Sequence, residues 1–447
     1  MIRLVFSDLR ENIATWAGAF AVALACGLIG GWAVSMMATA DGYTEGLRRI
    51  LQNAGSMMLV FSLVAAIAVL SSAANLTVAA QRRSYALWQL ANVRPSFVSR
   101  VVLGQLAVVA FLGAVCGTVF SAVTFIPLFP AVMSAQDQFA HVAPRVDLSK
   151  MPGVWFMVAG VFLCGGMRGA RNAAKTPPLT VLREPEPKRS GMTVLRVLLF
   201  VALVDCTVWI AFIMGESESD VVMNYSMYVP LLVTAAAASI APVVFSVLLR
   251  IWTSLVPQKH WNAWFLARRN ARYGLSASSS VETPVMVGFG LAAGIFSVVS
   301  LWEGFAISQG ATDFTGIDLT TSLLMLGGPV LLCAVGAAVS VIMTSRTRTR
   351  DVALLIASGA PPETLMASAV CEALIHAVTA TLVGVASVVC SNAIVAHAIG
   401  VPLLEGLAFG GGLVVSLVGF ALVLVATLAP TYRALNRETA MVLSARG

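Results

Sequence analysis

The sequence is poor in charge. Only 11% of its 447 residues are Asp, Glu, Lys or Arg, whereas 58% are hydrophobic, and the mean hydropathy is +0.88. Soluble domains carry about 25% charged residues, so a soluble fold is excluded. Uncharged stretches as long as a bilayer is thick recur along the chain, and helices satisfy their own backbone in lipid. The sequence therefore predicts an all-α, polytopic bundle of transmembrane helices.

The sequence also lacks the motifs of nucleotide and metal chemistry. It has four lysines and none follows a glycine, so the G-x-x-x-x-G-K-[ST] phosphate loop is missing. Its seven cysteines lie in apolar runs without a Cys-x-x-Cys pair, which is typical of small buried side chains. We therefore expect no catalytic, cofactor-binding or metal site and no enzyme activity in this chain. The net charge of +7 is explained by membrane topology rather than by nucleic-acid binding.

We predict about ten spans. They are roughly 16–38, 55–76, 101–126, 152–167, 194–214, 228–251, 284–307, 320–343, 367–396 and 407–428. The third and ninth are long enough to tilt or to extend into the cytoplasm. All but four of the 28 Lys and Arg residues fall on one side of this topology, so the positive-inside rule places both termini in the cytoplasm.

Two segments repeat at an offset of 267 residues. Residues 84–117 read SYALWQLANVRPSFVSRVVLGQLAVVAFLGAVCG, and residues 351–384 read DVALLIASGAPPETLMASAVCEALIHAVTATLVG, which align without a gap. A basic cluster precedes each segment and a long predicted span follows it. The segments 170–184 and 431–445 align in turn at an offset of 261 residues. The shared order of these features predicts two related halves.

Each copy contains a predicted helix–turn–helix. Gly359 can adopt the left-handed conformation that ends a helix. Pro361 and Pro362 then suit the first turn of the next helix, where a missing N–H costs little. In the first copy Asn92 stands in place of Gly359, and Asn is the next best residue for that backbone. We therefore expect a short helix beside the membrane, followed by a bend at the cytoplasmic surface.

The pattern of a basic cluster, an acidic residue, aliphatic residues, a glycine and a later glutamate resembles the FtsX-like permeases. These are the membrane subunits of ABC transporters that include macrolide exporters, lipoprotein-releasing complexes and bacitracin-resistance pumps. Asp351, Gly359 and Glu372 stand where that family has its acidic residue, glycine and glutamate. The segment AAKTPPLTVLRE, residues 173–184, resembles the closing motif of the family.

The resemblance implies an organisation in three parts. Residues 1–190 would form a first FtsX-like four-span unit, residues 191–256 two linking spans, and residues 257–447 a second four-span unit. The first copy departs from the family pattern, because Ser84 replaces the acidic residue and Gln105 replaces the glutamate. The two halves are therefore not expected to be equivalent.

The resemblance further implies that both turns dock on a cytoplasmic ABC ATPase, present in two copies, which would hold ATP and magnesium. The predicted docking residues are Arg83, Tyr85, Leu87, Trp88 and Arg94 in the first copy, and Arg350, Asp351, Leu354, Leu355 and Gly359 in the second. A simpler interpretation of the arginines at 346–350 is contact with anionic membrane lipid, worth about 1 kcal/mol per charge.

Three ionisable residues fall inside predicted spans, where such residues are functional candidates by default. Glu372 and His376 lie one helical turn apart in the ninth span, and Asp205 lies in the fifth. A structural hydrogen bond is the simpler interpretation of the Glu372–His376 pair, and a proton relay is the alternative. Asp205 has two open interpretations: it faces a polar lumen, or it pairs with a neighbouring helix.

The leading hypothesis is an ABC-transporter permease subunit in the bacterial plasma membrane. Its substrate would be hydrophobic or amphiphilic, such as a peptide, an antibiotic or a lipid. A first alternative is a signalling or scaffold protein that binds an ATPase without transport, which predicts ATPase turnover indifferent to amphiphiles. A second is an ion-driven secondary transporter, which predicts transport without ATP.

Overall fold

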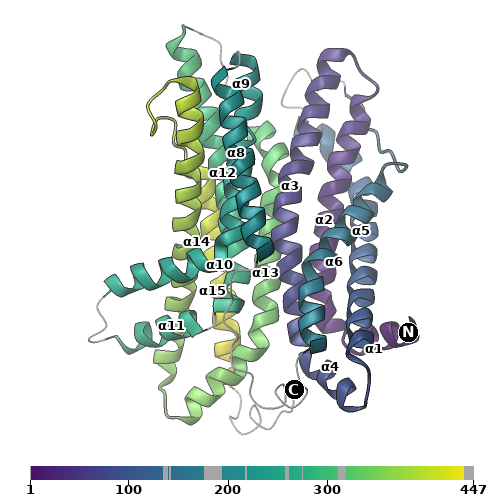
Figure 1. Ribbon diagram of the computed structural model, residues 1–447, viewed down its shortest axis with the longest axis vertical. Coiled ribbons are helices and arrows are strands. Elements are labelled where there is room, and N and C mark those ends of the chain that lie inside the picture. Colours follow the sequence, from purple (N-terminus) through teal and green to yellow (C-terminus); the bar gives the residue numbers. More distant parts are fainter. Residues whose placement is uncertain are drawn as a thin grey trace. The chain divides into compact units, whose positions relative to one another are not determined.

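The protein is a bundle of helices (Figure 1). A computed structural model describes residues 2–133, 139, 142–175, 194–216, 219–256, 261–273, 275–310 and 319–436, and gives only the backbone for some residues within helices. These described residues form α-helices and connecting turns and contain no strand. The predicted all-α class is confirmed.

Nine helices in the described part of the chain are long and apolar enough to cross a membrane. The helices that carry these spans are α2 (Ile13–Ala40), α3 (Glu45–Ala80), α5 (Pro95–Met133), α6 (Met151–Lys175), α8 (Val194–Glu216), α10 (Val229–Leu255), α12 (Leu275–Ser308), α14 (Pro362–Ile399) and α15 (Gly410–Leu435). The remaining predicted span, 320–343, falls in α13 (Leu319–Ala357), whose apolar part is the shorter stretch Gly327–Ser340. The shorter helices are α1 (Ile2–Glu11), α4 (Arg82–Leu90), α9 (Ser219–Ser226) and α11 (Asn262–Tyr273).

Helices α5 and α14 are much longer than a bilayer requires. They contain 39 and 38 residues. At a rise of 1.5 Å per residue each measures about 57 Å, nearly twice the hydrocarbon core of about 30 Å. The extra length predicted for the third and ninth spans is confirmed, and each helix can carry a displacement from one side of a membrane to the other.

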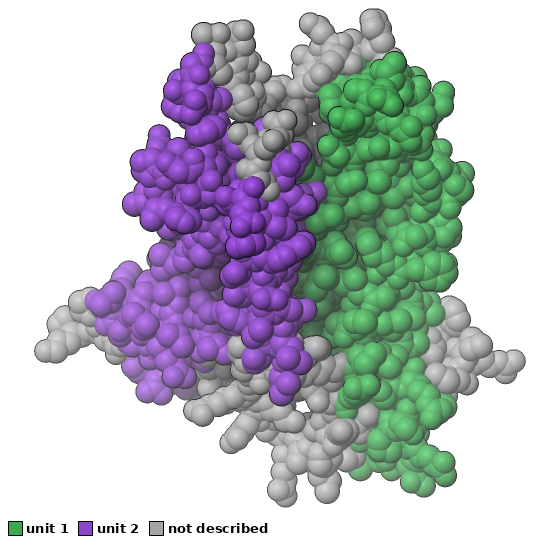
Figure 2. All heavy atoms as spheres, turned by 45° about the horizontal axis from the view of Figure 1, so that its top comes forward, with its two compact units in different colours: residues 1–186, 317–339 green, residues 187–316, 340–447 purple. Residues whose placement is uncertain are grey.

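The chain divides into two compact units, coloured green and purple in Figure 2. The first comprises residues 1–186 and 317–339. Its core consists of α2, α3, α5 and α6, with α1 against α5 and α4 against α5 and α6. The second comprises residues 187–316 and 340–447. In it, α14 contacts α10, α11, α12 and α15.

In the first unit α2 and α5 touch backbone to backbone. A Cβ atom on Gly27 would lie 2.4 Å from the carbonyl oxygen of Ala114, and one on Gly117 would lie 2.2 Å from that of Leu24. Only a residue without a side chain allows this approach, which is the usual reason for glycine between membrane helices.

The first part of α13 belongs to the first unit. A Cβ atom on Gly328 would lie 2.8 Å from Ile29 in α2, and one on Gly336 would lie 2.3 Å from Val69 in α3. By sequence, this segment belongs to the second repeat. The compact units are defined by contacts, whereas the predicted three parts were defined by the sequence. The predicted boundaries at residues 190 and 256 therefore stay a prediction.

Candidate functional site

Two turns, one in each compact unit, have the same backbone conformation. We call residues 82–95 the first turn and residues 349–362 the second turn. The first joins α4 to α5, and the second joins α13 to α14. Asn92 has φ of 63° and Gly359 has φ of 88°. The left-handed conformation predicted for both positions is confirmed.

Hydrogen bonds in the two turns match at the offset of 267 residues. The N–H of Val93 donates to the carbonyl of Trp88 at 3.0 Å, and the N–H of Ala360 donates to that of Leu355 at 3.0 Å. This bond across six residues is the mark of a Schellman helix end. The backbone of each turn therefore closes with the same local hydrogen bond.

The short helix begins differently in the two copies. In the first copy α4 is separated from α3 at Gln81, whose φ is −100° and ψ is 4°. In the second copy α13 runs without a break into the turn, so the expected separate helix is only the last part of α13. Arg348 stands in the place of Gln81, and the surrounding segment SRTRTR has no Gly or Pro to interrupt the helix.

The pattern of burial also repeats. Tyr85 and Val352, which are equivalent, are both buried. Two residues further, Leu87 is 51% exposed and Leu354 is 47% exposed. Large apolar side chains at matching exposed positions form the outer face of each turn. Trp88 and Leu355 beside them are half-buried.

The interior of the first turn is a chain of hydrogen bonds. The hydroxyl of Tyr85 lies 2.5 Å from Oε1 of Gln81 and 3.4 Å from Oε1 of Gln105. The Nε2 of Gln105 in turn donates to Oδ2 of Asp8 in α1 at 2.6 Å. Burial raises the pKa of Asp8, and it also raises the pKa of Tyr85. Tyr85, which we predicted as a docking residue, therefore lies inside the turn and positions its helix.

The interior of the second turn is apolar. Val352 and Leu365 are buried in one cluster, and further hydrophobic side chains pack against it. Those side chains are Leu266, Leu355, Ile356, Ala360 and Leu435. They come from α11, from the turn itself and from α15. The second turn is thus held by hydrophobic burial where the first is held by polar contacts.

Among the other predicted docking residues, Arg94 and Gly359 are exposed on the turns. The side chains of Arg83, Arg350 and Asp351 lie outside the described part of the structure. The role of all these residues in docking stays a prediction.

A buried charged cluster lies in the second unit. The Nδ1 of His376 is 2.7 Å from Oε1 of Glu282, and its Nε2 is 3.9 Å from Oε1 of Glu372. The side chain of Glu282 is fully buried, and those of the other two are nearly so. Sequence reasoning found the pair in α14 but missed Glu282, which lies 94 residues away in α12. The available signal was an acidic residue at the edge of an apolar span.

Asp205 is exposed on α8. Its neighbours Val204, Val208 and Trp209 are exposed as well. Within the described residues, groups of three or more His, Cys, Asp or Glu side chains that could hold a metal ion are absent. The structure does not bring Asp205 together with Glu372 and His376.

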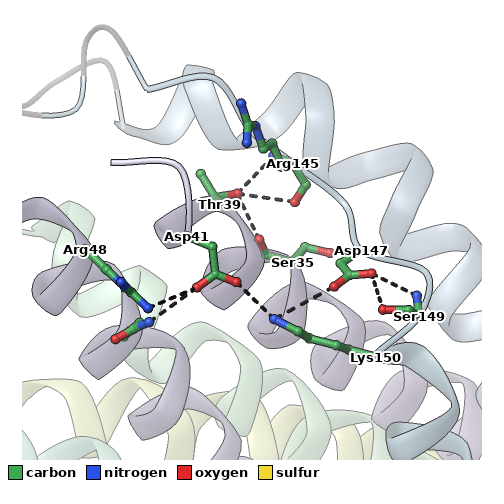
Figure 3. A network of polar contacts seen from close by, with 9 residues as sticks. Ser35, Thr39, Asp41, Arg48, Arg145, Asp147, Ser149 and Lys150 are labelled. Carbon is green, nitrogen blue, oxygen red and sulfur yellow. Dashed lines mark hydrogen bonds and ion pairs between the residues drawn. The ribbon is translucent and has the colours of Figure 1, made fainter. Parts of the chain in front are cut away.

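The other end of the first unit carries an exposed polar network (Figure 3). The Nζ of Lys150 lies 3.0 Å from Oδ2 of Asp41 and 3.8 Å from Oδ2 of Asp147, and Arg48 lies 3.8 Å from Asp41. The hydrogen bond from Lys150 lowers the pKa of Asp41, and bonds from Ser149 lower that of Asp147. Arg48 and Lys150 are two of the four basic residues that our topology places outside, and both have acidic partners here.

The same network fastens a loop. The backbone N–H of Arg145 donates to Oγ1 of Thr39 at 2.9 Å (Figure 3), and that of Ala143 donates to the hydroxyl of Tyr43. Exposed ion pairs contribute little to stability. The network therefore serves mainly to hold residues 142–150 against the end of α2.

These features first define a class: a polytopic helical membrane protein with a pair of matching helical turns. The family follows from comparison with known proteins. Residues 323–439 match the family of the FtsX-like permease C-terminal domain. The resemblance seen in the sequence is confirmed for these residues, which make up about a quarter of the chain and include the second copy only. No curated protein and no solved structure was found to match this chain.

The matched segment extends over α13, α14 and α15 and includes the second turn. FtsX-like permeases are membrane components of ABC-type systems and generally work with ABC ATPase partners. The chain is accordingly a multi-pass, permease-type membrane component. Its kinship with the macrolide-exporter or bacitracin-pump branch stays a prediction.

Proposed function

We propose that this chain couples two copies of a cytoplasmic ABC ATPase to the extrusion of a hydrophobic or amphiphilic substrate. The observation that carries the proposal is that the two turns have the same backbone conformation and that each exposes an apolar side chain at the same position. A single chain with two such turns offers one docking element to each of two ATPase copies. The ATPase would bind ATP and magnesium, and the bacterial plasma membrane would be the site of action.

The long helices supply the coupling. Helix α5 begins at Pro95 and α14 begins at Pro362, directly after the turns. Because each helix is continuous over about 57 Å, a displacement of the turn moves the opposite end as well. ATP-driven movement on one side of the membrane would thereby reach the other side. A peptide, an antibiotic or a lipid would be met in the bilayer or at the loop that Thr39 fastens.

Docking is tested by placing a charge on both exposed leucines. A variant carrying Leu87→Asp and Leu354→Asp should lose its ABC ATPase on purification from the native host, because a carboxylate cannot enter an apolar contact. Leu403→Asp is the matched control, since Leu403 is 53% exposed and lies outside both turns. The measurement is the amount of ATPase, identified by its sequence, that co-purifies with each variant. The docking role would be refuted if the double variant and Leu403→Asp recovered the same amount of ATPase.

A second candidate function is ion-driven transport. The buried cluster of Glu282, Glu372 and His376 favours it, because ionisable groups inside membrane helices occur in proton pathways. Reconstituted vesicles separate the candidates. The proposal requires amphiphile transport that depends on ATP and the partner, whereas a carrier would transport with an ion gradient alone. A scaffold protein would show ATP hydrolysis that no amphiphile changes.

A further inference from the structure

Helix α11 packs against α10 and α14 in the second unit and has two different long sides. Ala263, Trp264, Ala267 and Ala271 are buried on one side, where they pack with α10 and α14. Positions 261, 265, 268 and 272 recur at the spacing of a second helical stripe. The aromatic half of this stripe is exposed, because Trp261 is 53% exposed and Phe265 is 45% exposed, whereas Arg268 and Arg272 are half-buried.

Three tryptophans lie close together beside α11. The ring of Trp264 lies 5.9 Å from that of Trp252 and 6.1 Å from that of Trp261. Trp252 belongs to α10, close to the end of that predicted span. Tryptophan gathers at the level of lipid headgroups, since its ring is apolar and its N–H is polar. Of the three, Trp261 is the exposed one, and its ring is therefore suited to headgroup depth.

The other half of the stripe is cationic. Arg268 and Arg272 follow the aromatic residues along α11, and Arg250 lies at the facing end of α10. The Nη2 of Arg272 donates to the carbonyl of Arg250 at 3.2 Å and to Oγ1 of Thr253 at 3.3 Å. Burial and the charges of Arg268 and Arg250 lower the pKa of Arg272. Arg250 and Arg268 are thus near enough to Arg272 to act on its charge.

In the part of the chain that the structure describes, these charges have no acidic partner. Among the described residues, none of the three arginines has a carboxylate within ion-pair distance, and the sequence contains no Asp or Glu from residue 251 to residue 281. The Nε atoms of Arg268 and Arg272 are buried and have no hydrogen-bond partner among the described residues. A buried donor without an acceptor is costly, so the geometry calls for an anion.

We propose that Arg250, Arg268 and Arg272 bind the phosphate of an anionic phospholipid in the cytoplasmic leaflet. Guanidinium groups suit phosphate because they offer paired donors in one plane. The exposed Trp261 and Phe265 would contact the acyl-chain boundary of the same lipid, which selects a lipid over a free phosphate ion. Arg269, whose guanidinium lies 5.3 Å from the centre of the Phe265 ring, adds positive charge beside the site.

The lipid site has a direct connection to the second turn. Leu266, from the same helix, packs against the cluster that contains Val352 and Leu365. A lipid that anchors α11 would therefore also steady the second turn. This consequence rests on the proposed docking function, whereas binding of the lipid itself does not.

Lipid binding is tested on the full-length chain, purified alone in a neutral detergent. Thermal unfolding is followed during titration with short-chain phosphatidylglycerol, with phosphatidylcholine of the same chain length and with inorganic phosphate. A ligand of the folded state raises the unfolding midpoint. We expect stabilisation by phosphatidylglycerol only. In the Arg268→Gln/Arg272→Gln variant the half-saturating concentration should rise about tenfold or more, as expected for the loss of charge-assisted hydrogen bonds.

Arg100→Gln is the matched control, because Arg100 is exposed on α5 in the other unit. It should leave the titration unchanged. If the double variant does not fold, Arg250→Gln serves instead, since the side chain of Arg250 is exposed and Arg272 bonds to its backbone carbonyl. Equal stabilisation by phosphatidylcholine or by inorganic phosphate would overturn the proposal. The proposal would also be overturned if Arg100→Gln weakened the binding of phosphatidylglycerol as much as the double variant does. That result would indicate a general effect of net charge. Since no ATPase is present, the result is independent of the docking test.

Discussion

The first and second turns agree on the outside and differ on the inside. Outside, Leu87 and Leu354 are exposed at the same place on the same backbone. Inside, the first turn is built on the hydrogen bonds of Tyr85, and the second is built on the apolar cluster around Val352. Two unrelated interiors therefore support one outer surface. This difference favours the outer surface as the functional part, because the interior varies while the surface does not.

The same contrast continues along the long helices. Gln105 and Glu372 are equivalent by the repeat, and both are buried. Gln105 receives its acidic partner, Asp8, from α1, whereas Glu372 lies with His376, whose closer partner Glu282 comes from α12. Both units thus bury polar groups at this depth but satisfy them from different helices.

The largest expected effect comes from removing the acidic partner in the second unit. Glu282→Ala leaves the Nδ1 of His376 without its contact at 2.7 Å. Breaking a buried pair on one side costs about 3 kcal/mol. We therefore expect a marked loss of thermal stability in detergent. Glu372→Ala is the control, because its contact with His376 is longer, at 3.9 Å. An equal loss in both variants would show that the two acids act alike.

A smaller effect is expected at the equivalent glycines of the two long helices. A Cβ atom on Gly117 would meet the backbone of Leu24 at 2.2 Å, whereas one on Gly384 would meet the ring of Phe289 at 2.7 Å. A backbone cannot give way as a side chain can, so Gly117→Ala should cost about 2 kcal/mol, within the usual range for overpacking. Gly384→Ala should cost less. Thermal unfolding of the two variants measures the difference, and a reversed order would contradict the packing described for α2 and α5.

Much of this fold could be predicted from the sequence, because its causes are local. Hydropathy located the spans, since apolar length decides insertion. The left-handed residues at Asn92 and Gly359 followed from the few residue types that tolerate that conformation. Leu87 lies on the short helix α4, whereas Leu354 lies near the end of the long helix α13.

The rest depends on contacts between distant segments. Glu282 meets His376 across 94 residues, and no local pattern joins them. Tyr85 was predicted as a docking residue from the family resemblance, but its side chain is buried. Its hydroxyl lies beside Gln105, 20 residues away, and Gln105 in turn bonds to Asp8. Such partners are settled by helix packing, which a single sequence does not contain.

The turn residues offer a more subtle test of the comparison. Gly359 has φ of 88°, and no atom lies within 4 Å of the place that a Cβ atom would occupy, so a side chain there meets only backbone strain. Gly359→Ala should therefore cost about 1 kcal/mol, and Gly359→Asn should cost less, because Asn is found in this conformation at Asn92. Asn92→Gly should be close to neutral. Thermal unfolding measures all three, and equal losses for Ala and Asn at residue 359 would contradict the equivalence of the turns.

The smallest effect is a dependence on pH that Asp8 should give to the contacts of the first turn. Burial raises the pKa of Asp8 above its ordinary value of 3.8, although hydrogen bonds from Gln105 and Asn12 oppose this shift. Because the pKa is higher in the folded state, Asp8 stabilises the fold below pH 3.8, and this contribution is lost as the pH rises through the folded pKa. The Asn side chain in Asp8→Asn cannot ionise. As the pH rises through the folded pKa of Asp8, the temperature of unfolding should therefore fall less in this variant than in the wild type. Asp147→Asn is the control, because the pKa of Asp147 is shifted in the opposite direction. The pKa of Asp147 is lowered, so its contribution is present above the ordinary value and is lost as the pH falls. An unchanged slope in Asp8→Asn would show that the buried carboxyl does not titrate with folding.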